Sequence, residues 1–172
     1  YSEIEGPALK NIVKILSNNK FLNHITIGLD KANKTQFQDA KIFFKDLKVP
    51  HSVIWNDGPR MKSLDKQLSE QGLAPKEPGK GKNVWYCMGY ILARDQARSI
   101  AIHDCDILTY NKELLARLIY PVANPLFDYE FCKGYYPRLG NNKLNGRVTR
   151  LLVTPLLKTF KKVLGHRDYI EF

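Results

Sequence analysis

The sequence predicts an α/β domain in which a mostly parallel sheet is flanked by helices. Short apolar stretches with β-forming residues alternate along the chain with longer stretches whose apolar residues recur at helical spacing. Acids and turn-forming residues follow directly after the apolar stretches, where strands are expected to end. An order of strand, helix, strand, helix favours parallel strands joined by helical crossovers.

The chain begins with an expected helix. Ser2 and Glu5 have the spacing of a capping box, and Pro7 suits a first helical turn. Apolar residues then follow at helical spacing: Leu9, Ile12, Val13 and Leu16. No strand is predicted ahead of this helix, although an α/β domain ordinarily begins with one. We therefore expect these 172 residues to lack the first strand of their sheet.

The remaining elements follow from the same patterns. Strands are expected over residues 24–30, 51–55 and 100–102, and in the aromatic stretch 127–136. Helices are expected over residues 35–48, 59–68, 82–94 and 111–119, and from residue 147 onward with a kink at Pro155. Asn111 is the expected cap of the fourth of these helices, Trp85 and Leu92 are expected on the inward side of the third, and Leu151 and Leu152 on the packed side of the last.

Two aspartates one residue apart, Asp104 and Asp106, follow the expected strand 100–102. Open α/β sheets bind ligands at the carboxyl ends of their strands. Paired carboxylates at such a position suit Mg²⁺ or Mn²⁺ held together with substrate phosphates. The alternative is a solvated turn after a strand, because aspartate is common in turns.

Lys80 lies between two glycines just ahead of the expected helix 82–94. Backbone amides and a cation converge at such a place, which makes it a candidate phosphate contact. The pattern of a P-loop is absent, and a flexible surface loop is the alternative interpretation.

A third candidate anion site is the helix start formed by Gly146, Arg147, Val148 and Thr149. It offers unpaired amides, a hydroxyl and a guanidinium, which together suit a carboxylate or a phosphate. An ordinary first helical turn with a solvated arginine is the alternative.

Composition narrows the classes of function. The formal net charge of +10, from 27 basic and 17 acidic residues, favours anionic partners. The basic residues are spread along the chain without an arginine-rich run, so nucleic acid is not favoured. Three widely spaced cysteines indicate a reducing, cytoplasmic environment. No apolar run approaches 18 residues, so no membrane span is expected.

The order of these motifs resembles the glucosyl-3-phosphoglycerate synthase family. The motifs are the stretch 78–85 with Pro-Gly-Lys-Gly and Trp85, the acid pair, residues 133–138, the Gly-Arg-Val-Thr helix start and residues 155–157. The resemblance implies a GT-A (Rossmann-like) nucleotide-sugar-binding fold. It also implies transfer of glucose, with retention, from a nucleotide diphosphate donor such as UDP-glucose to 3-phosphoglycerate, with Mg²⁺ or Mn²⁺ as cofactor.

By position, the resemblance implies a role for each candidate residue but identifies no catalytic side chain. The donor would be bound by Glu3, Asp30, Lys80 and Asp104, the metal by Asp106, and the acceptor by Gly146, Arg147, Val148 and Thr149. The whole chain would be one domain, incomplete at both ends, with a donor-binding part at residues 1–110 and an acceptor-binding part at residues 127–172.

The expected partners are the nucleotide-sugar donor and the small phosphorylated acceptor, and a homodimer is left open. Two other functions also stay open. One is a nucleotidyltransferase, which likewise places paired acids at strand ends, and the other is a basic module that binds nucleic acid.

Overall fold

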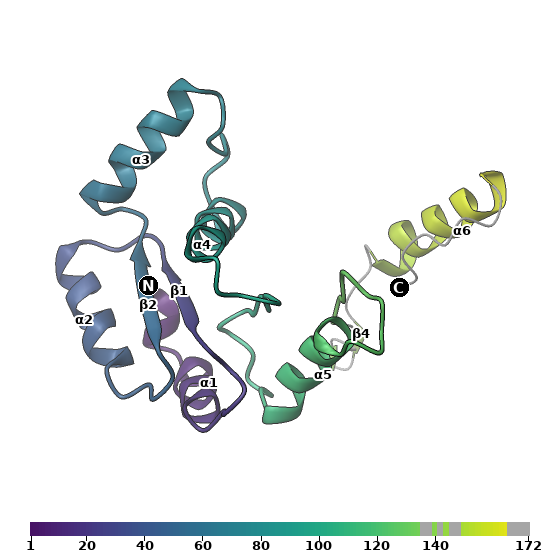
Figure 1. Ribbon diagram of the computed structural model, residues 1–172, viewed down its shortest axis with the longest axis horizontal. Coiled ribbons are helices and arrows are strands. Elements are labelled where there is room, and N and C mark those ends of the chain that lie inside the picture. Colours follow the sequence, from purple (N-terminus) through teal and green to yellow (C-terminus); the bar gives the residue numbers. More distant parts are fainter. Residues whose placement is uncertain (135–138, 141–142, 145–148, 165–172) are drawn as a thin grey trace.

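The computed structural model describes residues 1–134, 139–140, 143–144 and 149–164. The N-terminal region has three layers, with a two-stranded parallel sheet between helices (Figure 1). The first elements are the 3₁₀ turn η1 (Ser2–Ile4), α1 (Pro7–Ser17), β1 (Ile25–Leu29), α2 (Lys34–Phe44), β2 (His51–Trp55), α3 (Pro59–Glu70) and α4 (Lys80–Arg94). They are followed by α5 (Lys112–Ala123), β3 (Leu139–Gly140), β4 (Lys143–Leu144), the π-helical turn η2 (Thr149–Val153) and α6 (Thr154–Val163). The predicted α/β class is confirmed.

The two strands of the main sheet run parallel and pair over their full length, from Ile25 opposite His51 to Leu29 opposite Trp55. The Ile25 amide donates to the Pro50 carbonyl at 2.9 Å, and the Leu29 carbonyl accepts from the Asn56 amide at 3.0 Å. Because the peptide groups of alternate residues point to opposite sides of a strand, those of Thr26 and Gly28 point away from β2.

Local sequence explains where the helices begin. Pro7 and Pro59 occupy the first turns of α1 and α3, each after a glycine. The Asn33 side chain accepts from the Gln36 amide at 2.9 Å, and the Gln36 side chain returns the bond to the Asn33 amide. The predicted cap at Asn111 is confirmed, because its side chain accepts from the Leu114 amide at 2.9 Å. The predicted cap at Ser2 is wrong, since Ser2 lies in η1 and Gly6 precedes α1.

The core lies between α1, α2 and the sheet. Leu9 and Ile12 of α1 pack with Phe44 of α2, with Tyr110 just ahead of α5 and with Leu115 of α5. A second buried cluster joins Leu29, Ala32 and Ala40, with the Phe37 ring stacked on Trp55 at 4.9 Å. The other face of β1 is covered by α4. The buried apolar side chains of the described residues all lie between Ala8 and Leu115.

Two predicted strands are wrong. Residues 100–102 have no strand conformation, and neither do residues 127–134, the part of the aromatic stretch that the structure describes. Among the described residues, β1 and β2 pair only with each other, so no described strand pairs with the segment 100–102. An apolar run becomes a strand only when a neighbour supplies backbone hydrogen bonds, which explains why the composition of 100–102 misleads.

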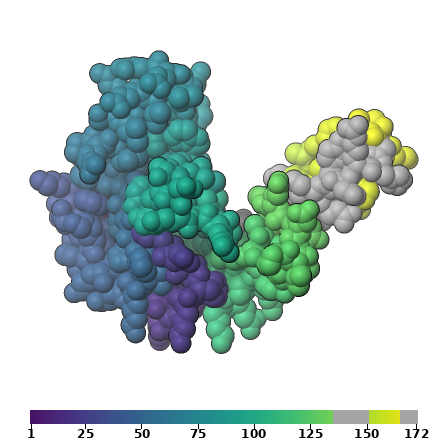
Figure 2. All heavy atoms as spheres, in the orientation of Figure 1, coloured from purple at the N-terminus to yellow at the C-terminus, as the bar shows by residue number. Residues whose placement is uncertain are grey.

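The described C-terminal elements extend away from this region (Figures 1 and 2). α6 has no buried residue; it follows η2 directly, and Pro155 is its second residue. The predicted break at Pro155 is therefore confirmed, whereas the leucines expected to pack there are exposed, Leu151 at 66% and Leu152 at 60%. Within the described residues, no helix has the length and apolar character to cross a membrane.

Candidate functional site

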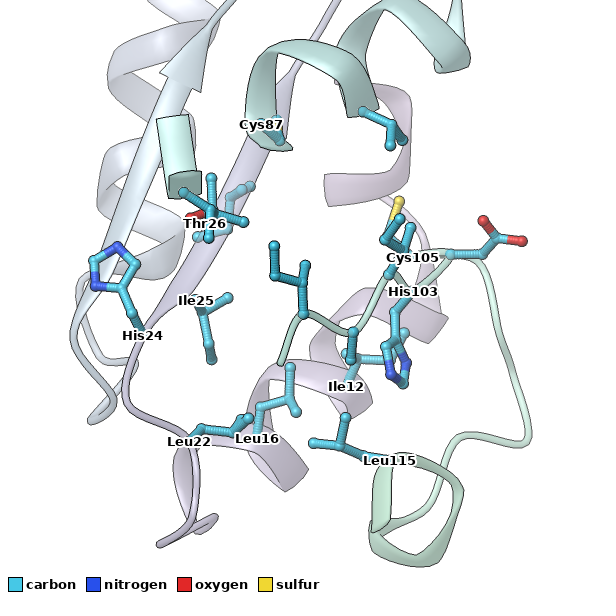
Figure 3. Close-up of a pocket in the computed structure, with 18 of the residues that line it drawn as sticks. Ile12, Leu16, Leu22, His24, Ile25, Thr26, Cys87, His103, Cys105 and Leu115 are labelled. Atoms are coloured by element: carbon cyan, nitrogen blue, oxygen red, sulfur yellow. The ribbon is translucent and has the colours of Figure 1, made fainter. Parts of the chain in front are cut away.

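A large cavity of about 1490 Å³ opens beside the free edge of β1. Figure 3 shows Ile25 and Thr26 of β1 on one side of it and His103 and Cys105 on the other. Residues of α1, α4 and α5 complete the lining, which is mostly apolar. This volume exceeds the roughly 300–1,000 Å³ of typical small-molecule pockets, so one small ligand would not fill it.

Four of the predicted site residues line the cavity together: Glu3, Lys80, Asp104 and Asp106. The Lys80 ammonium forms an ion pair with the Asp104 carboxylate, although 24 residues separate them. The Lys80 side chain is 68% exposed and that of Asp104 is 34% exposed, so both remain open to a ligand from solvent. The structure thus brings the glycine-flanked lysine and the acid pair to one place.

Lys80 owes its position to the glycine before it. Gly79 has a φ of 125° and immediately precedes α4, a conformation that side-chain-bearing residues rarely adopt. The Asn83 amide donates to the Gly79 carbonyl at 3.1 Å and closes the first helical turn. Lys80 is therefore the first residue of α4, two residues earlier than the predicted start, at the positive end of the helix dipole.

Asp106 is exposed and makes no ion pair or hydrogen bond within the described part of the chain. No group of three or more His, Cys, Asp or Glu side chains that could hold a metal occurs among the described residues. Mg²⁺ is ordinarily bound by one or two carboxylates together with substrate phosphates and water. A free carboxylate beside an ammonium that can contact phosphates therefore fits such a metal, provided that a phosphorylated ligand supplies further oxygens.

The two remaining donor candidates differ in position. Glu3 lies near Cys105, the residue between the two aspartates of the acid pair. The pKa of the Cys105 thiol is raised by burial and, next, by the negative charge of the Glu3 carboxylate. Asp30 is outside the cavity lining, and its carbonyl accepts from the Tyr1 ammonium at 3.0 Å. The structure therefore gathers Glu3 with Lys80 and the acid pair but leaves Asp30 at the end of β1.

Several polar groups of the cavity wall lack partners. Both ring nitrogens of His103, the Thr26 hydroxyl and His24 Nδ1 are buried without a hydrogen bond inside the described structure. Burial lowers the pKa of His103, against the opposing effect of the Asp104 carboxylate. Buried polar groups ordinarily have a hydrogen-bond partner in the protein or in water.

Asn83 also lines the cavity, one turn after Lys80, and no sequence motif singles it out. Its Nδ2 donates to the Gly28 carbonyl at 3.1 Å, and its Oδ1 accepts from Asn56 Nδ2 at 2.9 Å. An asparagine at the start of a helix has no distinctive pattern, so only the fold could identify these partners.

The acceptor candidates Gly146, Arg147 and Val148 lie outside the described residues. Thr149 is the first residue of η2. The predicted acceptor site therefore stays a prediction.

Comparison with known proteins supplies a second line of evidence. The chain is 44% identical over 172 residues to the glucosyl-3-phosphoglycerate synthase of Persephonella marina, covering all of this chain and 42% of that protein. It is 40% identical over 164 residues to the protein of the same name from Methanococcoides burtonii, covering 94% of this chain and 40% of that protein. The chain thus spans about two fifths of the length of these curated relatives. No family model matches the chain, and no solved structure matches it.

Proposed function

We propose that this chain is the donor-binding part of a glucosyl-3-phosphoglycerate synthase. Its predicted resemblance to that family is confirmed by two relatives of that name, which align with all or nearly all of this chain and with about two fifths of their own length. The observation that carries the proposal is the alignment of all 172 residues at 44% identity. The meeting of Lys80 with Asp104, at the cavity that Asp106 also lines, supports it from geometry. The proposed reaction moves glucose from a nucleotide diphosphate donor, with UDP-glucose as the expected one, to 3-phosphoglycerate.

Lys80 and Asp104 would divide the donor between them. Lys80 and Asp104 form an ion pair with each other. A bound donor must therefore give each of the two side chains a new partner. The diphosphate would take the Lys80 ammonium, whose charge offsets the negative charge that develops on the leaving group. The Asp104 carboxylate would then accept hydrogen bonds from ribose hydroxyls. Glu3, at the same end of the cavity, is a further donor contact in this proposal.

Asp106 would hold a divalent cation, Mg²⁺ or Mn²⁺, together with oxygens of the donor diphosphate. Such a cation supplies Lewis-acid stabilisation of the departing phosphate when it is bound. The Asp106 carboxylate is exposed and makes no hydrogen bond or ion pair within the described chain. It can therefore accept the ion without losing a native contact of either kind.

The acceptor-binding part is proposed at residues 127–172, with Gly146–Thr149 as the anion site and with retention of configuration at the transferred sugar. The support is the sequence alone: a glycine, an arginine and a hydroxyl at a helix start suit a carboxylate and a phosphate. No side chain of the described chain is assigned as nucleophile or base.

The GT-A form of the fold is also a proposal. Such a fold needs a continuous sheet, and here the cavity separates β1 from the segment 100–103. We infer that a further strand, supplied by the longer polypeptide, lies in the cavity beside β1. Its backbone would pair with the groups of Thr26 that point away from β2.

A screen of nucleotide-sugar donors against small phosphorylated acceptors tests the function. The natural polypeptide that contains these residues is incubated with each pair, and release of UDP and of diphosphate is measured separately. UDP released only in the presence of 3-phosphoglycerate is the expected result. Release of diphosphate would instead support a nucleotidyltransferase. A shift of nucleic acid on a gel at moderate salt, without turnover of any donor, would support the nucleic-acid-binding alternative.

Asp106→Ala tests the metal site within the same polypeptide. Turnover should fall at least about a hundredfold, because the transition-state charge loses its largest stabiliser. The thermal unfolding midpoint should not change, since Asp106 is exposed. Calorimetry should show that Mn²⁺ strengthens UDP binding in the wild type and not in the variant. Metal-independent UDP binding by the wild type would contradict the assignment.

A further inference from the structure

Asn83 links the start of α4 to both strands of the main sheet. Its amide group donates to the Gly28 carbonyl of β1 and accepts from the Asn56 side chain directly after β2. The Cys87 thiol, one turn further along α4, also contacts Asn83 Oδ1, at 3.6 Å. One side chain thus joins α4, β1 and the end of β2.

The same turn of α4 carries Lys80. Residues three apart on a helix lie on neighbouring positions of one side, so a bond that fixes Asn83 also fixes the backbone from which Lys80 projects. Lys80 itself is 68% exposed and has one described partner, Asp104, in a segment without regular structure. The side chain therefore cannot fix its own position, and the helix start must do so.

Gly28 is shaped to admit Asn83. A Cβ atom on Gly28 would overlap the Asn83 amide oxygen and lie 2.7 Å from the Cys87 sulfur. Any larger residue at this strand position would push the Asn83 side chain, and with it the first turn of α4, away from the sheet. Gly89 of the same helix differs, because a Cβ there would meet nothing within 4 Å.

We propose that Asn83 is the positioning residue that holds Lys80 at the donor diphosphate, and that Gly28 is a glycine because Asn83 needs the space. The inference rests on the proposed function in one respect, since it takes Lys80 as a donor contact. It goes beyond that function by assigning positioning roles to two residues that are not among the proposed donor contacts.

The test is steady-state kinetics on the natural polypeptide, varying donor and acceptor separately. Asn83→Ala should raise the donor KM about tenfold, which corresponds to one coupled polar contact, and should leave the acceptor KM unchanged. Gly28→Ala should likewise raise the donor KM and leave the acceptor KM unchanged, because the added methyl group displaces the Asn83 side chain. Gly89→Ala is the matched control and should change neither constant.

A double-mutant cycle separates positioning from a general loss of structure. If Asn83 acts through Lys80, then Asn83→Ala should change the donor KM less than about twofold when Lys80 is already alanine. Full additivity of the two effects would overturn the inference. Lys80→Ala without any effect on the donor KM would instead contradict the proposed function, so the two failures are distinguishable.

A milder variant keeps the test decisive if Asn83→Ala does not fold. Asn56→Ala removes one of the two bonds between Asn83 and the strand ends. It should raise the donor KM by a smaller factor, of about two to five, and this increase should also vanish in the Lys80→Ala background. An increase that persists without Lys80 would overturn the inference.

Discussion

The α/β region up to α4 and the region of η2 and α6 both contain helices with apolar residues on one side, but only the α/β region buries them. Helices α1 and α6 each have one apolar side, yet Leu9 and Ile12 of α1 are buried, whereas Leu156 and Phe160 of α6 are 46% and 45% exposed. The difference is that α1 faces a sheet and a second helix, while η2 is the described element that packs most closely on α6. An amphipathic pattern thus predicts a helix, but burial depends on a partner surface elsewhere in the polypeptide.

The largest expected effect is on the free energy of unfolding, and it compares a phenylalanine from each of the two regions. Phe44 is 3% exposed in the core and Phe160 of α6 is 45% exposed. Phe44→Ala should lower the free energy of unfolding by about 3–5 kcal/mol, because it leaves a cavity in packed surroundings. Phe160→Ala should change it by about 0.5 kcal/mol or less. Urea unfolding of the natural polypeptide measures both values. An equally large loss at Phe160 would show that the rest of that polypeptide covers α6.

The second expected effect contrasts the two strands. Thr26 of β1 and Val53 of β2 both have amides that point away from the partner strand. If the cavity holds a further strand, Thr26→Pro removes a sheet hydrogen bond and should cost about 3 kcal/mol. Val53→Pro on the outer edge removes no such bond and should cost less, its cost coming from the packing of Val53 on the core. Thermal unfolding of both variants in the natural polypeptide measures this difference.

Equal costs at the two positions would contradict a strand in the cavity. The 172 residues expressed alone should then fold as well as the whole protein. With the strand missing, we expect them to aggregate or to be partly unfolded, because both edges of the short sheet are open.

The sequence predicted elements whose causes are local and missed those whose causes are distant. The strand at 51–55 and the cap at Asn111 follow from neighbouring residues and are confirmed. Trp85 and Leu92 were predicted to lie on the inward side of α4, but they are 42% and 66% exposed. The buried residue of this helix is Tyr86. Tyr86 is buried because its hydroxyl donates to Asp65 of α3, and a helical pattern does not contain that partner.

The candidate site divides in the same way. Lys80 and the acid pair were singled out because glycines, charges and strand ends are visible in the sequence, and the resemblance joined them. Asn83 was not, because its partners are the Gly28 carbonyl 55 residues away and the side chain of Asn56. Contacts between ordinary polar residues that are distant in sequence become visible only in the folded structure.

Arg147→Lys asks whether the C-terminal region forms the acceptor site. An arginine can bind a carboxylate or phosphate through two parallel hydrogen bonds, and lysine cannot reproduce this geometry. Loss of one charge-assisted contact should weaken acceptor dependence at least about tenfold, while UDP affinity should not change. Lys80→Ala should have the reverse pattern. Titrations that vary donor and acceptor in turn measure both, and unchanged acceptor dependence in Arg147→Lys would remove the site from Gly146–Thr149.

The smallest expected effect concerns an ion pair of the α/β region. Lys82 Nζ lies 2.7 Å from Asp65 Oδ1, and the Tyr86 hydroxyl donates to the same carboxylate, so α3 is tied to α4. The hydrogen bond from Lys82, followed by that from Tyr86, lowers the pKa of Asp65. A carboxyl group with a lowered pKa in the folded state stabilises the fold above its unfolded pKa, near 4, and loses this contribution as the pH falls through the folded value.

Asp65→Asn should therefore lower the free energy of unfolding at pH 7 by about 1 kcal/mol or less, since the pair is partly exposed. The difference between variant and wild type should close at an acidic pH below the lowered pKa of Asp65 in the folded state. Glu113→Gln is the matched control, because the Glu113–Arg117 pair of α5 is exposed at 61% and 81% and should contribute little at either pH. Urea midpoints at the two pH values measure the difference. If the Asp65→Asn difference persisted in acid, packing of α3 on α4 rather than the charge of Asp65 would be the source of the stabilisation.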